Sequence, residues 1–305
     1  MIQKKDDSLT KTRLNRRPEF GPIWYIMPAI IVLVVINFYP LIRAINLSLY
    51  NYNLLKPNRI DFIGIKNFVE VIFNPIAWGA LKTTAIFTFG GTIIEIIFGL
   101  LLALLFNREF WGKGLVRSLI ILPMILSPVA VGLVWRIFYD ADAGMVNYFF
   151  SLIGLPVRAW LGNITTALPA LIATDVWQWT SFCFLVLLAA LEGMPIEPYE
   201  AAKIDGASVF QSFKFITFPL IKPILVIIFA LRMIDSIKMF DLVFIMTNGG
   251  PGRATETMNF LIYQTGFRFF HIGKASSQAI ILTIIVTVVS LLLLRKFIRM
   301  RGAES

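Results

Sequence analysis

Six long apolar stretches constrain the fold of this 305-residue chain more than any other feature of its sequence. A bilayer core about 30 Å thick is crossed by roughly 20 apolar helical residues, and in lipid only helices and closed barrels satisfy their own backbone hydrogen bonds. The chain is 57% hydrophobic and 15% charged, whereas soluble domains carry about 25% charged residues. The sequence therefore predicts an all-α polytopic membrane protein with six transmembrane helices. We expect these helices over residues 23–47, 81–106, 115–139, 167–191, 220–246 and 279–298.

The scarcity of cysteine and histidine excludes several classes of protein. Cys183 is the one cysteine, so neither a disulfide framework nor a multi-cysteine metal site can form. His271 is the one histidine, which excludes a histidine-cluster zinc site, and we expect it to be structural. A membrane-embedded enzyme would need a nucleophile–base pair or a metal constellation, and these two residues offer little material for either.

Lysine and arginine are distributed unevenly among the segments that flank the six stretches. If the N-terminus is cytoplasmic, the cytoplasmic segments hold about twice as many of them as the outer segments, in keeping with the positive-inside rule. We therefore predict cytoplasmic termini, with a basic tail over residues 1–22, a six-helix domain over 23–299 and a C-terminal tail over 300–305. The net charge of +10 then faces membrane lipid rather than nucleic acid.

The third of the six stretches contains two residues that disturb a membrane helix. Pro123 and Pro128 lie in the third stretch, and proline kinks a helix because it removes a backbone donor. The kink either lines a cavity or is only structural. The first stretch is longer than the apolar part of a signal peptide and no small-residue cleavage site follows it, so we expect it to remain as a helix.

The segment between the fourth and fifth stretches, about residues 193–219, has a dense local pattern. Pro198 suits the first turn of a helix, and Gly206 can adopt the left-handed conformation that ends one. Ser208 and Gln211 have the spacing of a capping box, which starts a new helix. The sequence thus predicts a helix, a sharp glycine turn and a second helix. Such an element either docks into a groove on a partner protein or lies at the membrane interface without a partner.

Two motifs give this chain a family resemblance. The first resembles the EAA signature of binding-protein-dependent ABC importer permeases, although Phe218 stands where leucine is usual. It comprises Glu200-Ala201-Ala202, Asp205-Gly206-Ala207, Phe213, Ile216, Pro219 and Pro223. The second is similar to the carbohydrate-uptake branch, the maltose and glycerol-phosphate permease type. It comprises Phe240-Asp241, Thr247-Asn248-Gly249-Gly250-Pro251 and Thr255-Glu256-Thr257.

The resemblance implies a type I importer permease with the MetI-like architecture, in a bacterial inner membrane. Such a permease pairs with a second, homologous permease, receives a carbohydrate from an extracytoplasmic binding protein and is driven by a cytoplasmic ATPase dimer. This chain has no Gly-x-x-x-x-Gly-Lys-Ser/Thr motif, so ATP and magnesium belong to the ATPase and this chain is a non-catalytic subunit without a cofactor or metal. The residues that the resemblance assigns to ATPase coupling are Glu200, Ala201, Ala202, Asp205, Gly206 and Ala207. Glu200 is expected to pair with a basic residue of the ATPase, and Gly206 to set the bend.

Polar residues inside the apolar stretches are candidates for the substrate pathway, because they are costly in lipid. In the fourth stretch, a carboxylate, an amide and aromatic rings share one helical face and suit a sugar's hydroxyls and C–H faces. These are Asp175, Gln178, Trp179 and Phe182, with Trp177 beside them. The alternative is that this face only packs against a neighbouring helix or lies in the outer aromatic belt.

The fifth stretch contains charges of alternating sign at three-residue steps: Arg232, Asp235, Lys238 and Asp241. Neighbouring pairs are expected to neutralise one another. These residues line a solvated cavity or the seam between two permeases, with Asp235 and Asp241 as candidate pathway residues. Alternatively, they form a self-paired polar stripe near the outer interface. Glu95 is alone in the second stretch and either faces the cavity or pairs with a cation on another helix.

Two further interpretations remain at this stage. The chain could be a secondary transporter driven by an ion gradient, but such proteins often contain inverted repeats and usually more than six spans, and we find no such repeat here. Residues 249–252 are glycine-rich but lack the lysine of a phosphate-binding loop, so we expect a turn in an external loop.

Overall fold

The computed structural model describes the backbone of residues 21–56 and 58–302, and the side chains of residues 25–56 and 58–295. The basic tail predicted over residues 1–22 therefore lies outside the described residues except for its last two positions. Residues 303–305 of the predicted C-terminal tail also lie outside them.

Four of the predicted spans form single long helices. They are α1 (Gly21–Ser48), α3 (Pro75–Phe106), α7 (Ala167–Glu192) and α12 (Ile272–Gly302). Helix α3 begins earlier than predicted because Asn74 caps it: its side-chain oxygen accepts a hydrogen bond from the backbone N–H of Ile76 at 2.9 Å, and Pro75 occupies the first turn. These helices confirm the all-α membrane fold.

The third predicted span is broken into two helices rather than being one continuous helix. The chain forms α4 (Lys113–Ile125) and α5 (Pro128–Phe138), whose axes differ in direction by 97°. Leu126 and Ser127 between them are extended, with ψ angles of 141° and 136°. The physical reason is the residue before a proline, which is pushed out of the helical region by the proline ring. Pro123, in contrast, is accommodated within α4.

The fifth predicted span is also shorter than expected. Helix α10 (Phe218–Ile237) ends nine residues before the predicted boundary, and the chain continues through a turn into the π-helix η2 (Val243–Thr247). Two side chains from a later segment bind the carbonyl groups at the end of α10. Asn259 donates to the Lys238 carbonyl at 2.7 Å and Thr257 to the Met239 carbonyl at 3.2 Å. These bonds satisfy carbonyl groups that a helix end leaves free.

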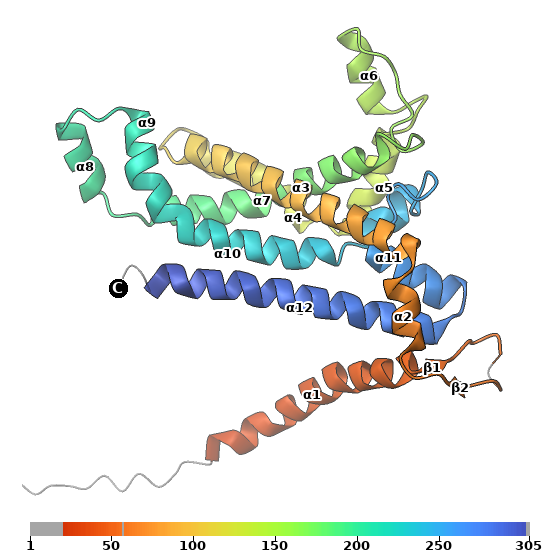
Figure 1. Cartoon of the computed structure of the whole chain (residues 1–305). Coiled ribbons are helices and arrows are strands. Elements are labelled where there is room, and N and C mark those ends of the chain that lie inside the picture. Colours follow the sequence, from red (N-terminus) through yellow and green to blue (C-terminus); the bar gives the residue numbers. More distant parts are fainter. Residues whose placement is uncertain (1–20, 57, 303–305) are drawn as a thin grey trace, which may run out of the picture.

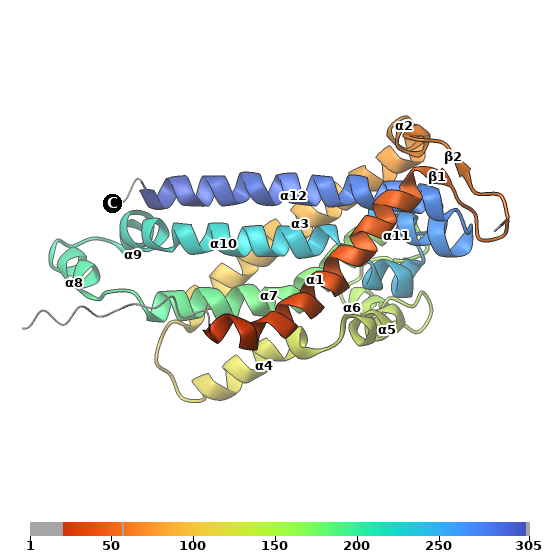
Figure 2. The ribbon, with the colours of Figure 1, turned by 90° about the horizontal axis from the view of Figure 1, so that it is seen from below.

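The remaining elements are short and lie at the two ends of the helix bundle (Figures 1 and 2). The α8–α9 segment projects from the end where α12 finishes, and β1, β2 and α6 lie at the opposite end. These elements are β1 (Tyr50–Asn51), β2 (Asp61–Phe62), α2 (Lys66–Ile72), α6 (Met145–Leu152), α8 (Glu197–Ile204), α9 (Val209–Ser212), the π-helix η1 (Phe213–Thr217), α11 (Met258–Tyr263) and the π-helix η3 (Gln264–Arg268). Strands β1 and β2 form an antiparallel pair with Tyr50 opposite Phe62.

The centre of the bundle is the contact between α3 and α7, with α10 packed against both. Gly99 allows the closest approach of α3 to α7, because a Cβ atom there would lie 2.5 Å from the Cβ of Cys183. Phe184 and Leu187 are fully buried at this contact. In contrast, α1 packs on α12 and diverges from the bundle toward its N-terminal end (Figure 1). Helices α3, α7 and α10 therefore form the frame that positions the polar residues.

Candidate functional site

The α8–α9 turn, residues 197–212, has the local structure that its sequence predicts. Helix α8 ends in a double hydrogen bond in which the Ala207 N–H donates to the Ala202 carbonyl at 2.9 Å and the Gly206 N–H to the Lys203 carbonyl at 3.3 Å. This is the Schellman arrangement, which needs a left-handed residue, and Gly206 supplies it with φ +75°. The predicted glycine turn is confirmed.

The second half of the turn is held by a capping box. The Ser208 N–H donates to Gln211 Oε1 at 2.7 Å, and the Gln211 N–H donates to Ser208 Oγ at 3.3 Å. Helix α9 then runs through η1 into α10 with helical backbone angles at every junction. The sequence from Val209 to Ile237 is consequently one continuous helical rod.

The tip of the turn is exposed and combines apolar and acidic side chains. Ile204, Val209 and Phe210 are 86%, 85% and 71% exposed, and Glu200 and Asp205 are exposed beside them. Exposed apolar groups gathered next to charges are typical of a protein-interaction surface. These three apolar residues were not among the predicted site residues, although their position around the predicted glycine turn was a signal that could have found them.

The base of the turn is anchored to the helix bundle. The Tyr199 hydroxyl lies 3.1 Å from the Thr217 hydroxyl, which joins α8 to η1. Beside it, Lys113 at the start of α4 forms ion pairs with Glu109 at 2.9 Å and with Glu192 at the end of α7 at 3.1 Å. The turn is therefore a capped unit whose tip is free and whose base is attached.

A second polar site lies inside the bundle, where α3, α7 and α10 meet. Arg232 Nε donates to Glu95 Oε2 at 2.6 Å, and its Nη2 donates to Glu95 Oε1 at 2.9 Å and to Asp175 Oδ2 at 3.3 Å. The side chains of Glu95 and Asp175 are fully buried, and that of Arg232 is 2% exposed. The Trp179 ring covers the guanidinium at 4.4 Å, a distance typical of a cation–π contact. We call Glu95, Asp175, Arg232 and Trp179 the buried ionic cluster.

The buried ionic cluster shows which partners Glu95 and Arg232 have. Glu95 pairs with Arg232 on another helix, which is one of the two alternatives that we predicted for it. Arg232 does not pair with its neighbour Asp235, which was one arrangement that the alternating charges allowed, because its guanidinium faces the bundle interior and bonds to two other helices. The Asp235–Lys238 pair does form, at 3.6 Å on an exposed face.

The predicted pathway residues divide into three groups. Asp175 and Trp179 belong to the buried ionic cluster, and Gln178 is buried nearby on α7, where its Nε2 donates to the Leu126 carbonyl at the break between α4 and α5. Phe182 packs edge-on against Trp179 at 6.4 Å. Trp177 points elsewhere: it is 41% exposed and contacts Trp135 at 5.5 Å.

Asp235 and Asp241 form the third group and lie apart from these side chains. Asp235 is 59% exposed beside Lys238, and Asp241 is half-buried just before η2. That any of the predicted pathway residues contacts a substrate stays a prediction.

The second sequence motif folds into a compact loop at the end of the bundle opposite the α8–α9 turn. Asn248 and Gly249 have φ angles of +52° and +83°, and the Thr247 and Thr255 hydroxyls lie 2.7 Å apart. Thr255 also donates to the Gly250 carbonyl at 2.7 Å. The expected turn at residues 249–252 is confirmed.

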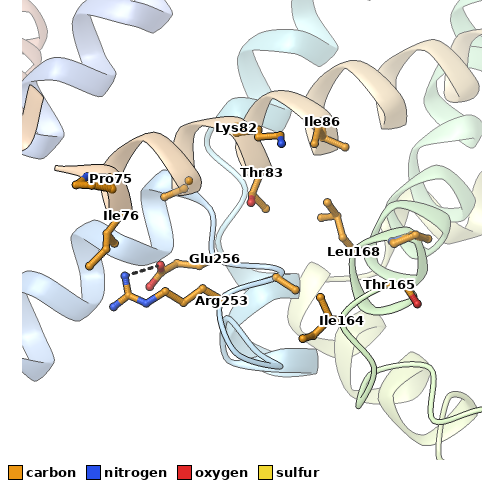
Figure 3. A pocket seen from close by; sticks show the side chains of 14 residues that line it. Pro75, Ile76, Lys82, Thr83, Ile86, Ile164, Thr165, Leu168, Arg253 and Glu256 are labelled. Carbon is orange, nitrogen blue, oxygen red and sulfur yellow. Dashed lines mark ion pairs between the residues drawn. The ribbon is translucent and has the colours of Figure 1, made fainter. Parts of the chain in front are cut away.

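This loop forms one wall of a cavity of about 570 Å³ (Figure 3). The start of α3 forms another wall, with Thr83 among the lining residues, and the residues leading into α7 form the third. Arg253 and Glu256 face each other at its edge with an N–O distance of 3.4 Å. Burial raises the pKa of the Glu256 carboxyl, and the positive charge of Arg253 offsets this in part.

His271 takes part in the packing at the same end of the bundle. Its Nδ1 lies 3.2 Å from Asn53 Nδ2, and the backbones of the two residues form an isolated β-bridge. Among the described residues, no group of three or more histidine, cysteine, aspartate or glutamate side chains is arranged to hold a metal ion. The contacts of His271 agree with a structural role.

Comparisons with known proteins give these features a family. Residues 95–301 match the family described as the inner membrane component of binding-protein-dependent transport systems. The trehalose/maltose transport system permease protein MalF of Thermococcus litoralis is 33% identical, over 88% of this chain and 89% of its own. The arabinooligosaccharides transport system permease protein AraP of Halalkalibacterium halodurans is 30% identical, over 88% and 85%.

A solved structure has the same fold. It is a bacterial ABC transporter involved in the import of the acidic polysaccharide alginate, and its matching chain superposes with a TM-score of 0.80 at 22% identity, covering 92% of this chain and 96% of that one. The resemblance that the two motifs indicated is thus confirmed. This chain belongs to the family of inner membrane permease components of binding-protein-dependent ABC importers.

Proposed function

We propose that this permease imports a carbohydrate and that the α8–α9 turn transmits the motion of a partner ATPase to the membrane helices. In this proposal a second, homologous permease completes the pathway and an extracytoplasmic binding protein delivers the sugar, polyol or oligosaccharide. ATP and magnesium bind to the ATPase dimer, and this chain contributes no catalytic group. Both termini and the α8–α9 turn face the cytoplasm, as the lysine and arginine distribution favours.

The observation that carries the proposal is the combination of a rigid turn with an exposed tip. The Schellman bonds and the capping box fix the angle between α8 and α9, so a force on the tip rotates the turn rather than melting it. The exposed apolar groups can enter a groove on a partner. The acidic groups on Glu200 and Asp205 can form charge-assisted hydrogen bonds with basic residues there.

The connection of the turn to the bundle provides the path for the motion. Helix α9 is continuous with η1 and α10, and α8 follows directly on α7 through residues 193–196. A displacement of the tip therefore acts on two helices of the bundle at once. Residues 213–217 are π-helical, a form often found at functional sites.

Charge reversal at Glu200 tests the coupling role. In the complete complex, Glu200→Lys should lower the amount of co-purified ATPase or the rate of ATP-dependent uptake at least tenfold, while the amount of permease in the membrane stays unchanged. Asp142→Lys is the matched control, because Asp142 is exposed in the loop before α6, at the opposite end of the bundle. Normal ATPase binding and normal uptake by Glu200→Lys would contradict the proposal.

The substrate class rests on relatives whose names mention sugars. Trehalose and maltose appear in one of these names and arabinooligosaccharides in another. A panel of sugars and polyols, added with the binding protein to the reconstituted complex, should stimulate ATP hydrolysis selectively. Uptake by the purified chain alone, driven by a proton or sodium gradient in liposomes, would overturn the importer proposal.

A further inference from the structure

The buried ionic cluster joins the two helices that carry the α8–α9 turn. Asp175 lies on α7, which leads into the turn, and Arg232 lies on α10, which leaves it. At 1.5 Å per residue, Asp175 is roughly 26 Å from the end of α7 and Arg232 is roughly 21 Å from the start of α10. The cluster therefore connects both legs of the turn at a similar depth, and Glu95 adds α3 to the same contact.

The geometry of the cluster favours one arrangement of the three helices. Both hydrogen bonds from Arg232 to Glu95 are short, and the planar guanidinium requires both partners to lie in its plane. Trp179 covers one face of the guanidinium. Gly91 of α3 lies beside both carboxylates, since a Cβ there would be at ordinary contact distance, 3.5 Å from Asp175 Oδ2 and 3.7 Å from Glu95 Oε1. Sliding or rotating α10 against α3 would break bonds between buried charges.

Charge balance shows which residue the arrangement depends on. The cluster contains two carboxyl groups and one guanidinium, all almost fully buried. Removal of one carboxylate still leaves a carboxylate beside Arg232. Removal of Arg232 leaves two acidic groups together without a cation, and an uncompensated buried charge is strongly unfavourable.

We infer that Arg232 is a positioning residue that clamps α3, α7 and α10 into one rigid body, so that a movement of the α8–α9 turn reaches the substrate pathway without slipping between helices. This inference rests on the proposed coupling role of the turn. It assigns the clamp a mechanical role, in which the cluster contacts neither the ATPase nor the carbohydrate.

The test uses the complete complex in proteoliposomes and measures the number of substrate molecules imported per ATP hydrolysed. The decisive variant carries Glu95→Gln, Asp175→Asn and Arg232→Met together, because it removes the clamp without leaving a buried charge. We expect it to assemble, bind the ATPase and hydrolyse ATP, but to import at least tenfold less substrate per ATP. Lys222→Met, on an exposed position of α10, is the control and should keep the wild-type ratio.

A second, more conservative variant keeps the inference testable if the triple variant does not assemble. Arg232→Lys keeps the charge but cannot form the planar pair of bonds with Glu95, and should also lower the ratio. A wild-type ratio in either assembled variant would overturn the inference. A change only in the substrate concentration needed for half-maximal uptake would also overturn it, because that result would indicate direct contact with the carbohydrate. Failure of the proposed function is distinguishable, since it would leave Glu200→Lys without effect on ATPase binding and uptake. Failure of this inference alone would leave Glu200→Lys impaired and the clamp variants at the wild-type ratio.

Discussion

Substitution of Gly99 by alanine tests how closely the frame of the protein is packed. The new Cβ would lie 2.5 Å from Cys183 Cβ, 2.9 Å from the Phe184 backbone nitrogen and 3.0 Å from the Cys183 carbonyl carbon. Carbon atoms pack at about 3.5–4.0 Å, so α3 and α7 would have to separate by roughly 1 Å. None of the three contacted atoms can turn away, because two belong to the backbone and the third is a Cβ.

The expected magnitude follows from these contacts. Overpacking of a core costs about 1–3 kcal/mol and occasionally more, while replacing a helical glycine with alanine returns roughly 0.5–1 kcal/mol. We therefore expect a net loss of about 1–2 kcal/mol for Gly99→Ala. Gly90→Ala is the matched control on the same helix, since its Cβ would meet only Ile172 Cδ1 at an ordinary 3.6 Å; this variant should be neutral or slightly more stable.

Thermal unfolding of the purified permease provides the assay. Cys183 is the one cysteine and is buried, so a thiol-reactive dye reports its exposure as the protein unfolds. Tryptophan fluorescence gives a second readout, which is needed because the substitution acts on Cys183 itself. The melting temperature of Gly99→Ala should fall by several degrees, at roughly 2–4 °C per kcal/mol. If both variants melted together with the wild type, the close approach of α3 to α7 would be refuted.

Three other predictions concern the two ends of the bundle. Ser208→Ala removes the acceptor of the Gln211 N–H bond and should cost about 1 kcal/mol of local helix stability, measured as faster hydrogen exchange over residues 209–212; unchanged exchange would contradict the capping box. Gly249→Ala places a Cβ 2.5 Å from Phe260 Cε1 at a φ of +83°, and should lower the melting temperature, whereas Gly64→Ala, also at positive φ but in open space, should lower it less. Burial raises the pKa of Glu256 in the folded protein, so the folded state binds a proton more readily than the unfolded chain. Stability should therefore rise as the pH falls from above this raised pKa toward the ordinary value of 4.5, and Glu256→Gln should lose this rise in melting curves recorded from pH 7 to pH 4; a rise of equal size in both proteins would count against it.

Much of the fold follows from short-range features of the sequence. A run of some 20 apolar residues must become a helix in lipid because each backbone group finds its partner within four residues, and four of the six predicted spans formed in this way. The α8–α9 turn is equally local, since Gly206, Ser208 and Gln211 form its defining bonds with residues at most five positions away. The α8–α9 turn, to which we assign the proposed coupling role, was for this reason predictable in both position and shape.

The remaining features depend on contacts between distant residues. The end of α10 depends on Thr257 and Asn259, about 20 residues further along the chain, and the residue at the break between α4 and α5 binds Gln178, 52 residues away. Arg232 has Asp235 within reach on its own helix but bonds to Glu95, 137 residues earlier. Asp235 lies three residues from Arg232, but the two side chains can pair only if they face the same surroundings. The packing of α3, α7 and α10 places Arg232 inside the bundle and leaves Asp235 on its surface. Neighbours along the chain therefore specify which segments form long apolar helices and how the turn between them is built. Which buried charges meet depends instead on which helix faces come together, and that is a property of the tertiary structure.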